Sequence, residues 1–160
     1  MEVTLLFGSN QGDRQALIRQ AMQQMTVIGP IKCSSSLYET APWGFEADNA
    51  FYNMAVTYTT ALSPTEVLHH CLETEKQLGR TRPAGGYASR TMDIDIILYD
   101  QQVISTPELT IPHPRMALRN FVLIPLNEIM PEYIHPVTHR TIASLLQSCP
   151  DTLEVHPIQQ

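Results

Sequence analysis

One eight-residue run, MDIDIILY from Met92 to Tyr99, restricts the possible folds of this chain more than any other segment. Its large apolar and β-branched residues are typical of a buried strand, but Asp93 and Asp95 interrupt it. Because side chains along a strand alternate between two faces, both aspartates share one face with Ile97. The other face carries four apolar side chains, those of Met92, Ile94, Ile96 and Leu98. We therefore expect a sheet with helices packed on one face and carboxylates on the other, open face.

The residues before this run predict three further strands and a helix. Val3–Phe7, Lys32–Thr40 and Phe51–Thr60 have the apolar, aromatic and β-branched content of strands. Between the first two, Asp13 can cap a helix that ends at Gly29. The buried face of this helix is expected to carry Leu17, Ile18, Ala21, Met22 and Met25.

A capping box predicts the start of a second helix. Ser63, Pro64, Thr65 and Glu66 combine a capping serine, a proline in the first turn and a glutamate three residues after the cap. This helix is expected to end at Gly79. The apolar face of this helix is expected to carry Val67, Leu68, Cys71, Leu72 and Leu78.

The predicted order over the first hundred residues is therefore β-α-β-β-α-β. This order is typical of an α+β, ferredoxin-like fold, an antiparallel sheet with two helices on one face. A short strand or hairpin near Gln102–Ser105 and helices over Arg119–Ile129 and Thr141–Gln147 form a C-terminal extension. With 160 residues, the chain is expected to be a single domain, 1–160.

Composition excludes several classes of function. The net charge of −6 disfavours a nucleic-acid binder, and no apolar run is long enough to span a membrane. The N-terminus lacks the basic region of a signal peptide, so a cytoplasmic location is expected. Three cysteines, Cys33, Cys71 and Cys149, suggest free thiols. His135 and His139 have the spacing of zinc ligands, but Pro136 disfavours a helix there, so we interpret them as surface loop histidines.

The aspartate pair indicates a magnesium and phosphate site. Two carboxylates on one strand face repel each other unless a cation lies between them, and Mg²⁺ prefers one or two carboxylates together with phosphate oxygens. Five arginines gather nearby in the sequence, at positions 80, 82, 90, 115 and 119, and guanidinium groups bind phosphates. The alternative is that the aspartates simply pair with these arginines.

Seven segments, in order along nearly the whole chain, resemble 6-hydroxymethyl-7,8-dihydropterin pyrophosphokinases. These segments are FGSNQGD, YETAPWG, FYNMAV, EKQLGRTR, SRTMDIDIILYD, LTIPHPRM and RNFVLIPLNEI. The resemblance implies transfer of pyrophosphate from ATP to the hydroxymethyl group of the pterin in folate biosynthesis, with AMP as the second product. We also expect the protein to be a monomer or a weak homodimer.

The resemblance also implies roles for individual residues. Asp93 and Asp95 would hold two Mg²⁺ ions and, with Arg80, Arg82 and Arg90, would form the catalytic set. ATP would be contacted by Glu75, Arg80, Arg82, Tyr87, Arg90, Ile96, Thr110, His113 and Arg119. The pterin would be bound by Thr40, Ala41, Pro42, Trp43, Phe51, Asn53 and Phe121, with the two phenylalanines stacking on its ring.

One segment departs from the pattern of the family. The loop between Arg82 and Arg90 reads PAGGYAS, where some members carry basic residues and a tryptophan. Tyr87 would therefore have to serve where the tryptophan acts.

Two other classes of function remain as alternatives. An RNA-recognition module can share the same order of elements, but it needs aromatic side chains on its central strands and a basic surface. A ferredoxin-like module that binds metal or nucleotide without catalysis would show the aspartates but produce no AMP.

Overall fold

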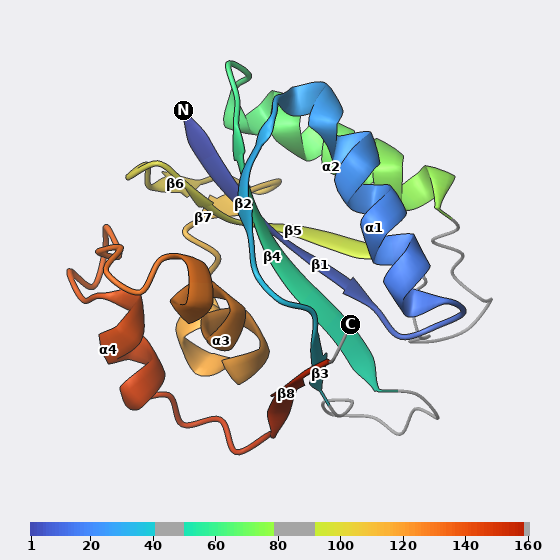
Figure 1. Cartoon of the computed structure of the whole chain (residues 1–160). Coiled ribbons are helices and arrows are strands. Elements are labelled where there is room, and N and C mark those ends of the chain that lie inside the picture. The colour runs from blue at the N-terminus through green and yellow to red at the C-terminus, as the bar shows by residue number, and fades with distance from the viewer. Residues whose placement is uncertain (41–49, 79–91, 159–160) are drawn as a thin grey trace.

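The computed structural model describes residues 1–40, 50–78 and 92–158. Within these ranges six strands form one antiparallel sheet. Five of them have the order β5-β1-β4-β3-β8, and the sixth, β2, also pairs with β4. The strands of the sheet are β1 (Glu2–Ser9), β2 (Ile31–Ser34), β3 (Tyr38–Thr40), β4 (Phe51–Thr59), β5 (Asp93–Tyr99) and β8 (Val155–Pro157). The chain order and the central β5-β1-β4 arrangement confirm the expected ferredoxin-like fold (Figure 1).

Two helices cover one face of the sheet (Figure 1). Helix α1 (Arg14–Gln24) begins where the Asp13 side chain accepts a hydrogen bond from the Ala16 N–H at 3.1 Å. Helix α2 (Pro64–Gln77) begins at the expected capping box, in which Ser63 and Glu66 bond each other's backbone N–H. The first core lies between these helices and the sheet, and its largest members include Phe7, Met25, Tyr58 and Tyr99. No helix of the described residues is long and apolar enough to cross a membrane.

The opposite face of the sheet is partly covered as well. Helices α3 (Asn120–Ile129) and α4 (Ile142–Gln147) pack on it and enclose a second core around Leu6, Ala55 and Leu123. The expectation that the carboxylate face is open is therefore wrong over this part of the sheet, because the apolar faces of the C-terminal helices need a partner. Among the described residues, Asp93 and Asp95 lie on this face but are not members of the second core.

A β-bulge in β5 changes the expected side-chain alternation. Leu5 pairs with Ile96 and Thr4 pairs with Leu98, so Ile97 is an extra residue in the ladder. Beyond the bulge the faces exchange, and Leu98 joins Ile97 in the second core, whereas Tyr99 enters the first. The prediction that Leu98 lies on the same face as Met92, Ile94 and Ile96 is therefore wrong, because one extra residue moves the side chains that follow it to the opposite face of the sheet.

The strand expected over Lys32–Thr40 is two strands. Residues 35–37 separate β2 from β3, and Ser35 is buried there with its hydroxyl accepting the Ala55 N–H at 3.0 Å. Both pieces still pair with β4, so the expected topology is kept. Strand β8 was not predicted; it pairs with β3 at the edge of the sheet. The short strand expected near Gln102–Ser105 is β6 (Ile104–Ser105), which pairs with β7 (Thr110–Ile111).

Two side chains lie elsewhere than expected. Leu72 is 50% exposed, and Thr74 and Glu75 take its place on the buried face of α2, because spacings of three and four residues from Cys71 define that face. His135 is buried rather than on the surface, and its Nδ1 accepts hydrogen bonds from the Val137 and Thr138 N–H groups. Among the described residues, no group of three or more potential ligands could hold a metal ion.

Candidate active site

The strand register brings the carboxylates and the pterin-set residues of β3 and β4 to one face of the sheet. Gly8 of β1 lies opposite Asp93 on one side and opposite Asn53 on the other. Residues directly opposite each other in a ladder point to the same face. By the same rule, Asp95 shares a face with Leu6, which lies opposite it, and Thr40 shares a face with Phe51. Two groups of residues that are distant in sequence therefore share one face, about two strand spacings, or ~10 Å, apart.

Asn53, Gly8 and Asp93 form a row across strands β4, β1 and β5. Gly8 lies in the middle of this row, and its lack of a side chain makes room for the side chain of Asn53. A Cβ atom at position 8 would approach Asn53 Oδ1 to 2.9 Å, closer than real Cβ contacts. The sequence predicted a first strand over Val3–Phe7, but β1 continues through Gly8 to Ser9. The contact with Asn53 crosses from one strand to another, so the local sequence gave no sign of it.

Thr40 and Asn53 form the polar floor at the other end of the row. Their side chains are almost completely buried, and Thr40 Oγ1 has no hydrogen-bond partner among the described residues. A buried hydroxyl without a partner is unfavourable and rare, so it indicates a position where a ligand completes the hydrogen bonding.

Two aromatic side chains come to the same face from different elements. Phe51 begins β4, and Phe121 lies in the first turn of α3. Both are half-buried. The guanidinium of Arg119 lies 5.5 Å from the centroid of the Phe121 ring, which links the expected pterin-stacking residue to an expected phosphate ligand.

Asp93 and Asp95 are half-buried at the start of β5. Two carboxylates do not make a complete protein cage for a metal. They do fit Mg²⁺, which usually keeps several water molecules and binds one or two carboxylates together with phosphate oxygens. The residues present are therefore compatible with a magnesium ion that arrives with a nucleotide.

The cationic side chain of Arg119 interacts electrostatically with these aspartates. Burial lowers the pKa of Arg119, and neighbouring Arg115 lowers it further, whereas Asp95, Asp151 and Asp93 raise it. Arg119 nonetheless keeps its charge at neutral pH, because guanidinium groups are effectively always protonated. The arrangement places a fixed positive charge within electrostatic reach of both strand aspartates.

His113 lies beside the same cations in a neutral form. Burial lowers its pKa most, followed by the charges of Arg119 and Arg115. Its Nδ1 accepts a hydrogen bond from the Arg115 N–H at 3.2 Å, so the ring proton belongs on Nε2. The His113 N–H in turn donates to the Ile97 carbonyl at 2.9 Å, which ties this segment to β5. His113 can thus donate one hydrogen bond from Nε2 to a phosphate oxygen.

The remaining described residues of the predicted ATP set lie around β5. Glu75 is buried, and its Oε2 accepts the backbone N–H of Ile94, between the two aspartates, at 2.7 Å. This bond fixes α2 to the strand that carries the carboxylates. The side chain of Ile96 is in the first core, so a contact with ATP would be made by its backbone. Thr110 is exposed on β7.

Several predicted site residues lie outside the described residues. They are Arg80, Arg82, Tyr87 and Arg90 of the ATP set and Ala41, Pro42 and Trp43 of the pterin set. Their roles remain predictions.

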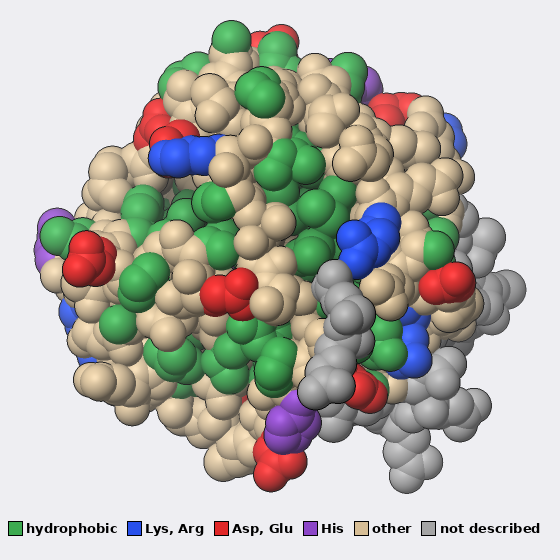
Figure 2. Space-filling view, viewed as in Figure 1, with side chains coloured by type: hydrophobic (Ala, Val, Ile, Leu, Met, Phe, Trp, Pro, Cys, Tyr) green, Lys and Arg blue, Asp and Glu red, His purple; other side chains and the backbone are tan. Residues whose placement is uncertain are grey.

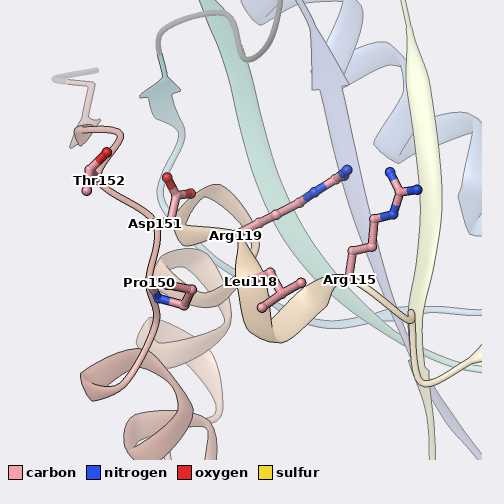
Figure 3. A pocket seen from close by; sticks show the side chains of 6 residues that line it. All are labelled: Arg115, Leu118, Arg119, Pro150, Asp151 and Thr152. Carbon is pink, nitrogen blue, oxygen red and sulfur yellow. The ribbon is translucent and has the colours of Figure 1, made fainter.

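A pocket of about 420 Å³ lies between the start of α3 and the C-terminal segment. Figure 3 shows that Arg115 and Arg119 project from the segment before α3, whereas Asp151 and Thr152 come from the chain beyond α4. The pocket is lined by Arg115, Leu118, Arg119, Pro150, Asp151 and Thr152. The sequence did not single out Asp151 or its neighbours.

The surface gives no broad basic region on the face shown in Figure 2. Lys and Arg side chains lie there in small separate groups among neutral and acidic ones. This distribution agrees with the overall negative charge of the chain.

Comparisons with known proteins give a consistent result. The model of the family described as "7,8-dihydro-6-hydroxymethylpterin-pyrophosphokinase (HPPK)" matches residues 4–131. The 2-amino-4-hydroxy-6-hydroxymethyldihydropteridine pyrophosphokinase of Porphyromonas gingivalis is 41% identical over 138 residues, which cover 84% of this chain and 93% of that protein. The Bacillus subtilis protein of the same name is 44% identical over 128 residues, 78% of this chain and 75% of that protein.

Solved structures share the fold. Wild-type HPPK-DHPS of Plasmodium falciparum superposes with a TM-score of 0.71 at 18% identity, over 91% of this chain. A second HPPK-DHPS structure, determined in complex with substrates, gives a TM-score of 0.72 at 17% identity over 92% of this chain. The match covers 44% and 43% of those longer chains, respectively.

Proposed function

The chain belongs to the 7,8-dihydro-6-hydroxymethylpterin-pyrophosphokinase family, and we propose that its chemistry takes place on the sheet face around Gly8. It is an ATP-dependent diphosphotransferase of folate biosynthesis. It transfers pyrophosphate from ATP to 6-hydroxymethyl-7,8-dihydropterin. The observation that carries the proposed location is the register, in which Asp93 and Asp95 share a face with Thr40, Phe51 and Asn53.

In this proposal the nucleotide lies at the aspartate end of the face. Arg119 supplies a fixed positive charge and His113 a hydrogen bond from Nε2, and both act on phosphate oxygens. Arg80, Arg82 and Arg90 complete the phosphate contacts, and Tyr87 covers them. Glu75, Thr110 and the backbone of Ile96 hold the remainder of ATP. Asp93 and Asp95 would hold two Mg²⁺ ions, which supply charge neutralisation and a lower pKa for the pterin hydroxyl.

The pterin lies at the other end of the face. Thr40, Asn53 and the backbone of Ala41, Pro42 and Trp43 provide its hydrogen bonds, and Phe51 and Phe121 stack on its ring. The buried, unpartnered hydroxyl of Thr40 supports this assignment. With the pterin at Asn53 and the nucleotide at Asp93, the hydroxymethyl group points toward the phosphates in this proposal.

The transfer step needs positioning more than a strong base. The hydroxymethyl oxygen attacks the β-phosphorus of ATP, a new bond forms between these atoms, and the bond from the β-phosphorus to the oxygen of the α-phosphate breaks. AMP leaves with the bonding electrons, and the hydroxyl proton is lost to solvent. Holding both substrates in line on one rigid sheet supplies much of the rate enhancement.

The proposal is tested by following the products of ATP in the presence of Mg²⁺ and the pterin. We expect AMP and the pterin diphosphate, and we expect Asp93→Asn and Asp95→Asn each to reduce kcat by a factor of about 100 or more. Asp100→Asn is the matched control, because Asp100 lies beyond the end of β5 and its side chain accepts the Glu2 N–H.

Three results would count against the proposed site. ADP in place of AMP would contradict the reaction. No turnover from folded wild-type protein would favour the alternative, a non-catalytic module that binds metal or nucleotide. Wild-type activity in both aspartate variants would mean that the pair is structural.

We also propose that the protein is a single domain that acts in the cytoplasm as a monomer or weak homodimer. Free thiols at Cys33, Cys71 and Cys149 support a reducing compartment.

A further inference from the structure

Helix α3 begins without a side-chain cap of its own. Its N-cap residue is Arg119, whose side chain makes no capping hydrogen bond. The first backbone N–H groups of a helix need partners from outside the helix. This turn also carries Phe121, so two proposed substrate contacts depend on how it is held.

Asp151, from the segment beyond α4, supplies the missing cap. Its Oδ2 accepts the backbone N–H of Asn120 at 2.8 Å, and its own carbonyl accepts a hydrogen bond from Asn120 Nδ2 at 3.0 Å. Its Oδ1 accepts the Leu153 N–H at 2.9 Å, which fixes the carboxylate in place. A negative charge at this position also interacts favourably with the helix dipole. Figure 3 shows Asp151 at the beginning of α3, beside Arg119.

The segment that carries Asp151 continues into the edge of the sheet. Four residues later the chain forms β8, in which Val155 pairs with Thr40 and Pro157 pairs with Tyr38. The Ile158 N–H donates to the Leu37 carbonyl at 2.8 Å and closes this attachment. One short segment therefore joins the start of α3 to β3, the strand that carries Thr40.

The other end of α3 is fixed to the same part of the sheet. Glu128 Oε2 accepts the Ser36 N–H at 2.9 Å, and Oε1 accepts the Tyr38 hydroxyl. These contacts hold the last turns of α3, so the position of its first turn depends on other contacts. The hydrogen bond between Asp151 and Asn120 is one of them.

We infer that Asp151 is a positioning residue for the transfer reaction. It holds the first turn of α3 so that Phe121 and Arg119 stay over the sheet face, and β8 keeps Thr40 at a fixed place relative to them. The inference rests on the proposed roles of Phe121 and Arg119. It adds a residue that touches neither substrate and acts through those two.

The test compares Asp151→Ala and Asp151→Asn with Thr141→Ala. Thr141 is a matched control, because its hydroxyl caps α4 by accepting the Ser144 N–H at 3.1 Å, in a helix that carries no proposed substrate contact. We expect Asp151→Ala to raise the KM for both the pterin and ATP about fivefold, the change that corresponds to loss of an ordinary helix cap. We expect kcat to change by less than about twofold, and Asp151→Asn, which keeps an acceptor, to restore both KM values.

Thermal unfolding distinguishes a role of Asp151 in positioning the substrate contacts from a role in stability alone. A cap that is only structural would lower the melting temperature in Asp151→Ala and Thr141→Ala alike and leave KM unchanged in both, and that result would overturn the inference. An asparagine variant as impaired as the alanine variant would also overturn it, because the charge rather than the cap would then be responsible.

Amide hydrogen exchange gives a readout that does not depend on activity. We expect the amides of residues 120–123 to exchange at least about fivefold faster in Asp151→Ala and at the wild-type rate in Thr141→Ala. If the wild-type protein formed no AMP, the proposed function would fail, but these exchange rates would still decide whether Asp151 holds the first turn. Unchanged exchange in Asp151→Ala would overturn the inference.

Discussion

At the scale of single residues, the absence of one atom shapes the candidate site. Gly8 lies between Asp93 and Asn53 in the row across the sheet, and the Asn53 amide occupies the space above it. Any side chain at position 8 would compete with that amide. The position therefore requires glycine because of a neighbouring side chain, since its backbone continues an ordinary strand.

Replacement of Gly8 by alanine is expected to weaken pterin binding selectively. The new Cβ would displace the Asn53 side chain, which can rotate away, so the free energy of unfolding should change by less than about 1 kcal/mol. Loss of the hydrogen bonds made by Asn53 should raise the KM for the pterin about tenfold. Steady-state kinetics with each substrate varied in turn measure this effect.

A double-mutant cycle identifies the cause. Because Gly8→Ala is expected to act through Asn53, adding it to Asn53→Ala should raise the KM for the pterin by less than about twofold more. Additive effects of the two changes would show that position 8 acts on the pterin directly.

At the scale of elements, the helix starts were the features best predicted from the sequence. The signals for α1 and α2 are local, since Asp13 and the Ser63–Glu66 box bond to backbone groups within three residues. The start of α3 is different, because its cap comes from Asp151, 31 residues away. Strand β8 was missed for the same reason: its partner β3 lies far back in the chain, and three residues carry too little pattern.

The capping box gives a prediction about stability alone. Ser63→Ala removes the acceptor for the Glu66 N–H and should lower the free energy of unfolding by about 1 kcal/mol. The kinetic constants should stay unchanged, because the contact of α2 with β5 is made by Glu75, three turns further along the helix. Denaturant unfolding measures the loss, and Thr65→Ala, an exposed change in the same turn, is the control.

At the scale of the whole molecule, the sheet serves two cores and a site. Helices α1 and α2 cover one face, and α3 and α4 cover part of the other (Figure 1). The aspartates, the β-α-β-β-α-β order and the family resemblance could all be read from the sequence. The partly covered second face could not, because it depends on where the C-terminal helices pack. The predicted site residues at 41–43 and 80–90 fall outside the described residues and stay predictions.

The fold is expected to lose stability in mild acid through His135, which is buried, and His113, which is half-buried. Burial lowers the pKa of His135, as it does that of His113, so the unfolded chain takes up these protons first as the pH falls. Stability from this source is complete above the usual histidine pKa of about 6.5 and is lost as the pH falls toward the lower folded-state pKa.

The variant His135→Asn tests this pH dependence. Asparagine can accept the Val137 and Thr138 N–H bonds without titrating, so the free energy of unfolding should fall less steeply below pH 6.5 than in the wild type. Urea unfolding at a series of pH values measures the slope, and the exposed His69→Asn reports the effect of removing a histidine from the surface. An unchanged slope in His135→Asn would contradict the assignment.

The bulge at Ile97 means that β5 is two half-strands of opposite phase. In the proposed function the first half presents Asp93 and Asp95 to the substrates, and the second half buries Leu98 in the core with α3 and α4. Deleting Ile97 would join the halves in a single phase, so either the carboxylates or the leucine would face the wrong way. A variant without the bulge would therefore lose either the burial of Leu98 or the proposed position of the carboxylates.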